Sequence, residues 1–196
     1  MLKVGITGGI GSGKTTVCKI FATLGIPIYY SDIRAKELMV KDKKLIQGIK
    51  NEFGENAYLE DGSLNRQHIA AIAFNDKTKL QALNALVHPV VHRDGNEWVA
   101  LQTNVSYTLK EAALIFEGGG HRLLDKVITV FAPKATRIQR VMQRDKTTVA
   151  AVEARINKQM PEEDKIKLAD FVIYNDGEHS LIDQVLKIHK ILCEIV

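Results

Sequence analysis

The stretch GGIGSGKTTV, residues 8–17, decides the fold of this chain. It meets the spacing G-x-x-x-x-G-K-[ST] with Gly8, Gly13, Lys14 and Thr15. A short apolar run precedes it and the helical-looking VCKIFATLG follows it. A glycine-rich loop between a strand and a helix offers backbone N–H groups and the positive end of the helix to a chain of phosphates. The stretch therefore predicts a nucleotide-binding α/β protein.

The loop also predicts individual roles. We expect Lys14 to reach the β- and γ-phosphates and the Thr15 hydroxyl to hold Mg²⁺. The residues expected to contact the nucleotide are Gly9, Gly11, Ser12, Gly13, Lys14, Thr15 and Thr16. The alternative is a glycine-rich turn with a chance Lys-Thr pair, and the flanking strand and helix disfavour it.

Strands and helices alternate along the chain. The predicted strands are residues 3–7, 26–30, 107–116, 126–131 and 171–174, and the predicted helices are 13–24, 32–40, 135–144, 148–159 and 180–195. Such alternation indicates a parallel sheet with helices on both faces. Residues 42–105 are mostly helical and too long for a simple crossover, so they predict an inserted helical subdomain.

Several polar residues follow predicted strands, and ligands of parallel sheets bind at the carboxyl ends of strands. The phosphate loop, Asp32, Glu117 and Asn175 are therefore expected at one rim. From the stretch around Asp32 alone, a helix N-cap, for which Ser31 or Asp32 is suited, is a better explanation than a role for Asp32 as the proton acceptor of a kinase. Glu111 could hold Mg²⁺ through water, or it could be buried or paired. His88, before Pro89, is more simply structural than substrate-binding.

Arg137, Arg140 and Arg144 share one helix stripe. They could close over ATP as part of a lid, because phosphoryl transfer spreads negative charge over the moving group. The alternative is a solvated surface helix with nearby acidic partners, Glu162 among them.

Composition and charge limit the kinds of molecule that this chain is expected to bind. The 196 residues are 45% hydrophobic and 26% charged, with net charge +4 and no basic block. No run approaches the roughly 18 apolar residues of a membrane span, and no signal-peptide plan is present. We therefore expect a cytoplasmic protein that binds a polyanionic small molecule, with no nucleic-acid or membrane partner.

The chain resembles the dephospho-CoA kinase family over nearly its full length. The matching segments begin at the residue given: TGGIGSGKTTV at 7, LGIPIYYSD at 24, DGSLNR at 61, HPVV at 88, ALIFE at 113, QRVMQRD at 139, ARINKQM at 154 and ADFVIYNDG at 169. The loop is shared by many nucleotide enzymes, whereas the ordered set is much more specific.

The resemblance implies a P-loop kinase fold, a three-layer α/β/α arrangement with a parallel central sheet, a helical insert and a small helical lid. The implied core covers about residues 1–32, 106–134 and 169–196, the CoA-binding insert about 33–105 and the lid about 135–168. The implied reaction moves the γ-phosphoryl of ATP to the ribose 3′-hydroxyl of dephospho-CoA, with Mg²⁺. A monomer, or at most a weak oligomer, is expected.

The resemblance also implies residue roles. Asp32 matches the family's proposed general base, and Arg140, with Lys14, contacts the phosphates. Asn175 matches a position near the adenine. The residues implied near the acceptor are Asp32, His88, Leu114, Phe116 and Glu117. Tyr30 stands where the family often has the first Asp of Asp-Ala-Asp, which leaves that residue's role in doubt.

Two rival functions follow from the same loop. Another nucleotide or nucleoside kinase is disfavoured by the helical insert with its His-Pro pair. A guanine-specific switch would be expected to carry N-K-x-D after a late strand, and residues 174–177, YNDG, lack the Lys.

Overall fold

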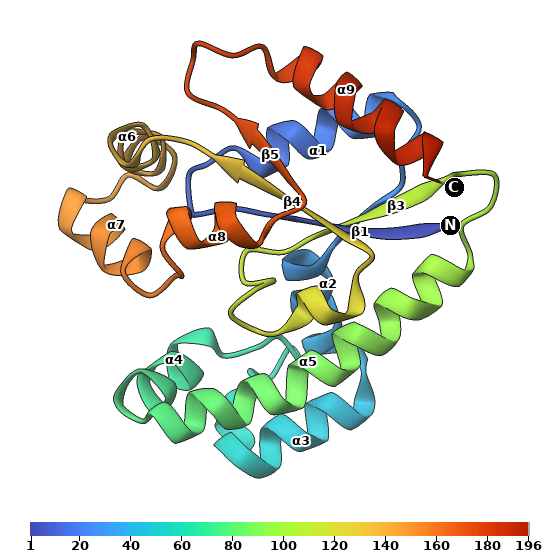
Figure 1. Cartoon of the computed structure of the whole chain (residues 1–196). Helices are drawn as coiled ribbons and strands as arrows, with labels where there is room; N and C mark the ends of the chain where they lie inside the picture. The colour runs from blue at the N-terminus through green and yellow to red at the C-terminus, as the bar shows by residue number, and fades with distance from the viewer. Residues whose placement is uncertain (196) are drawn as a thin grey trace. The chain divides into compact units, whose positions relative to one another are not determined.

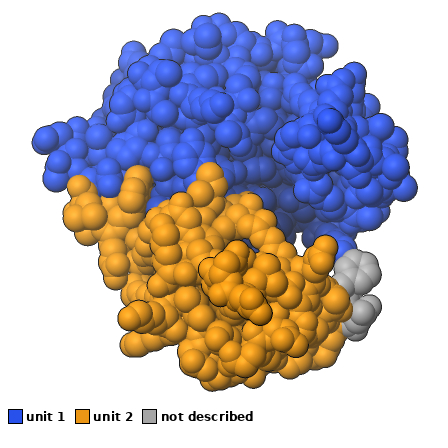
Figure 2. Space-filling view, turned by 180° about the vertical axis from the view of Figure 1, so that it is seen from behind, with its two compact units in different colours: residues 1–30, 102–196 blue, residues 31–101 orange. Residues whose placement is uncertain are grey.

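The structure is a computed structural model that describes residues 1–195, with side chains at all of these positions except 74, 75 and 77. The chain divides into two compact units, which Figure 2 distinguishes by colour. Unit 1 consists of Met1–Tyr30 and Gln102–Val196, and unit 2 consists of Ser31–Leu101. The expected division into core, insert and lid stays a prediction.

Unit 1 is built on a parallel sheet with the strand order β2-β3-β1-β4-β5 (Figure 1). The strands are β1 (Leu2–Thr7), β2 (Ile28–Tyr30), β3 (Tyr107–Glu111), β4 (Lys126–Phe131) and β5 (Phe171–Tyr174). Each neighbouring pair runs parallel, with Val4 opposite Leu109 on one side and Lys126 on the other. The predicted α/β class with a parallel central sheet is confirmed.

The two faces of the sheet bury different layers, because successive side chains of a strand point to opposite faces. Val4, Ile6, Ile128 and Val130 belong to the main core with apolar residues of the helices α1 (Lys14–Thr23) and α9 (Leu181–Glu194). On the other face, Val127 packs in a smaller cluster near the helix α8 (Glu162–Leu168). Figure 1 shows α1 and α9 on one side of the sheet and α8 on the other.

The third strand is shorter than predicted. The sequence pattern predicted a strand over residues 107–116, whereas β3 ends at Glu111 and residues 113–119 form turns. The Ala112 N–H still donates to the Ile6 carbonyl at 3.2 Å. After that bond the chain leads away from β1 and reaches a 3₁₀ helix, Gly120–Leu123. The apolar run over residues 107–116 therefore forms a strand in its first part and a turn in its second.

The segment between β4 and β5 is mainly helical. It contains α6 (Lys134–Asp145), α7 (Val149–Ile156) and α8. The predicted helix over 148–159 was too long, because α7 ends at Ile156, and α8 was not predicted. Three acidic residues in the first turn of α8 and two lysines toward its end complement the helix dipole.

Unit 2 is a helical unit. It contains α2 (Ser31–Lys41), α3 (Lys43–Phe53), a 3₁₀ turn (Glu55–Ala57), α4 (Arg66–Asn75) and α5 (Lys77–Ala100). Side chains of Asp42, Asn65 and Asp76 cap three of these helices by accepting backbone N–H bonds. In Figure 1, α3 runs beside α5. None of the helices in residues 1–195 combines the length and apolar character needed to cross a bilayer.

Candidate active site

The phosphate loop lies between β1 and α1, as the sequence predicted. Gly13 stands at the N-cap of α1 with φ 96°, and no side chain caps the helix. That φ lies in the left-handed region, which a residue with a Cβ rarely adopts. The first N–H groups of α1 are therefore available to an anion placed at the helix end.

Neighbouring side chains leave no room for a larger residue in the loop. A Cβ on Gly13 would collide with the Asn175 amide nitrogen. A Cβ on Gly9 would collide with an Arg137 guanidinium nitrogen and lie 2.6 Å from a Glu162 carboxylate oxygen. The glycines thus allow polar side chains from later in the chain to pack directly against the loop backbone.

Lys14 folds back over its own loop. Its Nζ donates to the Gly8 carbonyl at 2.8 Å and to the Gly9 carbonyl at 3.4 Å. These bonds hold an ammonium group beside the helix end that would receive phosphates. Thr15 and Thr16 lie in the first turn of α1 and are exposed, whereas Ser12 is fully buried.

Asn175 connects the phosphate loop to the arginine helix. Its Nδ2 donates to the Ser12 carbonyl at 2.8 Å, and its Oδ1 accepts from Arg140 Nη2 at 3.3 Å. The Asn175 backbone carbonyl accepts from the same Arg140 nitrogen, also at 3.3 Å. Arg140 Nη1 is buried and has no hydrogen-bond partner within the described residues. Its position near Gly13 places an unmatched cationic group at the helix end.

The three arginines of the predicted stripe have different surroundings. Arg137 is buried against the loop, Arg140 contacts Asn175, and Arg144 lies on the surface with Asp145. Hydrogen bonds from Arg144 and then Arg155 hold the pKa of the Asp145 carboxyl well below its usual range. Of the three, Arg137 and Arg140 therefore lie at the loop, and Arg144 does not.

The predicted acceptor residues of unit 1 lie in the turn after β3. Leu114 is exposed, whereas Phe116 is buried and its ring lies 5.5 Å from the His121 ring, centroid to centroid. Glu117 Oε1 accepts from the Met160 N–H at 2.9 Å and lies 3.1 Å from Lys165 Nζ. Glu117 is thereby fixed to the segment around α8.

The other two predicted acceptor residues belong to unit 2. Asp32 is exposed in the first turn of α2, and His88 is exposed on α5. Because α2 begins at Ser31, Asp32 lies inside the helix rather than at its N-cap. The expectation that Asp32 is the N-cap is therefore wrong, and its carboxylate instead lies in the first turn, where it complements the helix dipole.

Sequence reasoning missed a buried charged cluster beside the loop. The sequence predicts Glu162 as an exposed acidic partner of the arginine helix, yet Glu162 is only 6% exposed, and Lys165 is fully buried. The only sequence signal was their spacing of three within a charged segment, and such segments are usually solvated. Glu111 is also buried, at the carboxyl end of β3.

Comparisons with known proteins identify the chain. Residues 2–180 match the family model described as CoaE, dephospho-CoA kinase. The chain belongs to the dephospho-CoA kinase family. A dephospho-CoA kinase of Chlorobaculum tepidum is 40% identical over 204 residues, covering 100% of this chain and 97% of the relative. One of Bacillus anthracis is 36% identical, covering 89% of this chain and 88% of the relative.

Solved structures share this fold, and one of them is named a dephospho-CoA kinase. The Thermus thermophilus protein TT1252 has a TM-score of 0.85 at 34% identity, covering 100% of this chain and 98% of its own. A dephospho-CoA kinase from Campylobacter jejuni has a TM-score of 0.71 at 27% identity, covering 98% and 97%. An Acinetobacter baumannii shikimate kinase has a TM-score of 0.54 at 17% identity, covering 100% and 94%, and shows the fold alone.

Proposed function

We propose that this chain transfers the γ-phosphoryl group of ATP to the ribose 3′-hydroxyl of dephospho-CoA, giving coenzyme A and ADP. The observation that carries the proposal is the uncapped start of α1, surrounded by Lys14 and Arg140, in a chain of this family. An uncapped helix end with two cations nearby suits a triphosphate rather than a neutral ligand.

The proposed mechanism is an in-line displacement. The acceptor hydroxyl oxygen forms a bond to the γ-phosphorus while the bond from that phosphorus to the β,γ-bridging oxygen breaks. Lys14 and Arg140 stabilise the charge that develops on the phosphoryl oxygens. The Asp32 carboxylate accepts the proton of the attacking hydroxyl, the role that the family resemblance implies for it, and its exposed position in the first turn of α2 is compatible with this role.

The remaining residues hold the substrates. Backbone N–H groups of the loop surround the phosphates, and Asn175 lies on the nucleotide side. His88, Leu114, Phe116 and Glu117 contact dephospho-CoA. The Thr15 hydroxyl, in the first turn of α1, would hold Mg²⁺. Kinases bind this ion with few protein groups and with the substrate phosphates, whose negative charge it would neutralise.

We further propose that the protein works in the cytoplasm as a monomer, with its small-molecule substrates as its partners and with no nucleic-acid or membrane partner. The positive net charge of +4 favours the binding of two polyanionic substrates. A size-exclusion measurement at micromolar concentration checks the monomer, and a dimer peak would contradict it.

The reaction is tested by measuring ADP release from Mg·ATP with and without dephospho-CoA, with mass spectrometry of the acceptor. We expect a species heavier by one phosphoryl group that forms only when dephospho-CoA is present. ADP release that is independent of dephospho-CoA, with no acceptor product, would contradict the proposal and indicate a hydrolysing switch.

Asp32→Asn tests the proton acceptor. We expect turnover to fall by about 10²- to 10⁴-fold, because the amide cannot take the hydroxyl proton. ATP affinity, measured by calorimetry, should stay within about twofold, since Asp32 is not assigned to the nucleotide. Asp61→Asn in the same unit is the matched control and should keep full activity. A full-rate Asp32→Asn enzyme would remove Asp32 from the mechanism.

A further inference from the structure

Four charged side chains form a row within unit 1, from the phosphate loop to Glu117. Residue exposure is 5% for Arg137, 6% for Glu162 and 0% for Lys165, and the Glu117 side chain is 20% exposed. Arg and Glu residues are almost never fully buried without a partner, and a fully buried Lys is equally rare. The row therefore requires an explanation.

The charges alternate along the row. Arg137 Nη1 lies 3.7 Å from Glu162 Oε1, and the same oxygen lies 3.8 Å from Lys165 Nζ. Lys165 Nζ lies 3.1 Å from Glu117 Oε1. Lys165 is thus shared between two carboxylates, and Glu162 is shared between two cations.

The row touches the phosphate loop at its first member. The space that a Gly9 side chain would fill is taken by Arg137 and Glu162. The Arg137 carbonyl oxygen lies 2.6 Å from the position of a Gly11 Cβ. A displacement of Arg137 would therefore be transmitted directly to the loop backbone, because packed interiors have little free volume.

The last member reaches the turn that carries Leu114 and Phe116. Glu117 Oε1 accepts a hydrogen bond from the Met160 N–H and forms an ion pair with the Lys165 ammonium. Both groups come from the segment that contains α8. Glu117 is therefore held by one fully buried side chain, Lys165, and by one backbone N–H, that of the half-buried Met160.

The row is poorly explained by stability. Arg137 Nε, both Glu162 carboxylate oxygens and Lys165 Nζ make no hydrogen bond of good geometry within the described residues. Burying charges without full hydrogen bonding costs free energy that ion pairs often return only in part, and apolar residues of similar volume are often at least as stabilising. Unsatisfied buried groups of this kind often have a functional reason.

We propose that Lys165 is a positioning residue that orients Glu117 for the acceptor and, through Glu162, holds Arg137 under the phosphate loop. The inference rests on the proposed function and deepens it, because it names a group that links the two substrate sides. Lys165 itself touches neither substrate.

A double-mutant cycle tests the proposal, using Lys165→Met, Glu117→Gln and the double variant. We expect Lys165→Met to raise the KM for dephospho-CoA by about tenfold or more, since small misplacements of binding groups cost this much. If Lys165 acts through Glu117, the double variant should have the KM of the more affected single variant. Lys167→Met, an exposed lysine on the same helix, is the matched control and should behave as wild type.

Other outcomes overturn the inference. Effects on the dephospho-CoA KM that multiply in the double variant would mean that Lys165 does not act through Glu117. A lowered melting temperature with both KM values unchanged would mean a structural role only. The wild-type protein is assayed first. If it forms no coenzyme A, the proposed function itself fails, and the variants are not needed to show this.

A second variant controls for the case that Lys165→Met does not fold. Glu162→Gln together with Lys165→Met removes one charge of each sign, so that Arg137 and Glu117 remain balanced. We expect this pair to melt closer to wild type than Lys165→Met while the dephospho-CoA KM stays raised about tenfold. Recovery of the wild-type KM along with stability would overturn the positioning role.

Discussion

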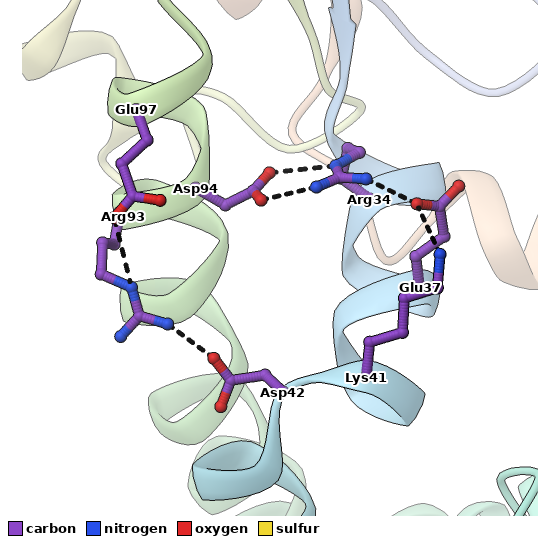
Figure 3. A network of polar contacts seen from close by, with 7 residues as sticks. All are labelled: Arg34, Glu37, Lys41, Asp42, Arg93, Asp94 and Glu97. Atoms are coloured by element: carbon purple, nitrogen blue, oxygen red, sulfur yellow. Dashed lines mark hydrogen bonds and ion pairs between the residues drawn. The ribbon is translucent and has the colours of Figure 1, made fainter.

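The two units use charged residues in opposite ways. In unit 2, Figure 3 shows two sets of ion pairs that link α5 to α2 and to the start of α3. One set consists of Arg34, Asp94, Glu37 and Lys41, and the other of Arg93, Asp42 and Glu97. Several of these contacts are short, such as Arg34 Nη2 to Asp94 Oδ1 at 2.6 Å. In unit 1, the buried row has longer contacts, 3.7 and 3.8 Å around Glu162.

We infer from this difference that burial, rather than a short distance, decides which ion pairs matter for stability. The network of unit 2 is partly solvated, with Arg93 52% and Glu97 70% exposed, so water and salt reduce what each pair contributes. The row of unit 1 lies away from water, and removing one member leaves the others uncompensated. The weaker-looking contacts should therefore have the larger effects.

Glu162→Ala should give the largest effect. It leaves Arg137 and Lys165 buried without the carboxylate between them, and breaking such a pair costs about 3–5 kcal/mol of unfolding free energy. Urea unfolding followed by circular dichroism measures the change. Glu163→Ala, an exposed neighbour, is the control and should stay within about 0.5 kcal/mol. A loss below 1 kcal/mol for Glu162→Ala would contradict the inference that the buried charges of unit 1 contribute more than the exposed charges of unit 2.

Asp42→Ala should cause the second largest loss of unfolding free energy. Asp42 accepts from the Leu45 N–H at 2.9 Å as N-cap of α3 and from Arg93 at 2.6 Å. Removing a cap costs about 1 kcal/mol. Asp42→Asn keeps the cap and removes the charge, so its loss at pH 7 should be smaller. Equal losses in the two variants would assign the effect to the ion pair instead.

The Asp42 effect should depend on pH. The bond to the Leu45 N–H, and then Arg93, lower the pKa of the Asp42 carboxyl. A lowered folded-state pKa contributes stability above the unfolded pKa of about 3.9, and this contribution is lost as pH falls through the folded value. The difference between wild type and Asp42→Ala should therefore shrink below about pH 4. A difference that grows on acidification would contradict this sign.

Arg34→Ala should have a smaller effect. Its guanidinium donates twice to Asp94, at 3.0 and 2.6 Å, but its side chain is 38% exposed. Exposed pairs contribute about 0.2–1 kcal/mol, and a bidentate pair should lie toward the upper end. Lys36→Ala on the same helix is the control for changed helix propensity. A loss above 2 kcal/mol would show that unit 2 depends on its network as unit 1 does.

Glu97→Ala should have the smallest effect. Its contact with Arg93 is 3.8 Å long, and both side chains are more than half exposed. We expect a change in unfolding free energy within about 0.3 kcal/mol, measured by the same urea titration at low and high salt. A larger, salt-dependent loss would indicate that the exposed network acts cooperatively.

Local patterns predicted much of the fold. The strands over residues 126–131 and 171–174 were predicted with the observed bounds, because short apolar runs between turn signals are typical of buried parallel strands. The turn after Glu111 was missed because residues 113–116 remain apolar outside the sheet. Helix α8 was missed because its charged sequence has no apolar stripe to reveal it.

The sequence by itself determined the phosphate loop, the parallel α/β class and the family, since glycine spacing and short apolar strands are local properties. Only the tertiary structure decided which charges are buried. Glu162 and Lys165 look like Glu163 and Lys167 in the sequence, yet the first pair is buried and the second exposed. Burial depends on what packs against a residue from distant parts of the chain, here the phosphate loop and the turn at Glu117.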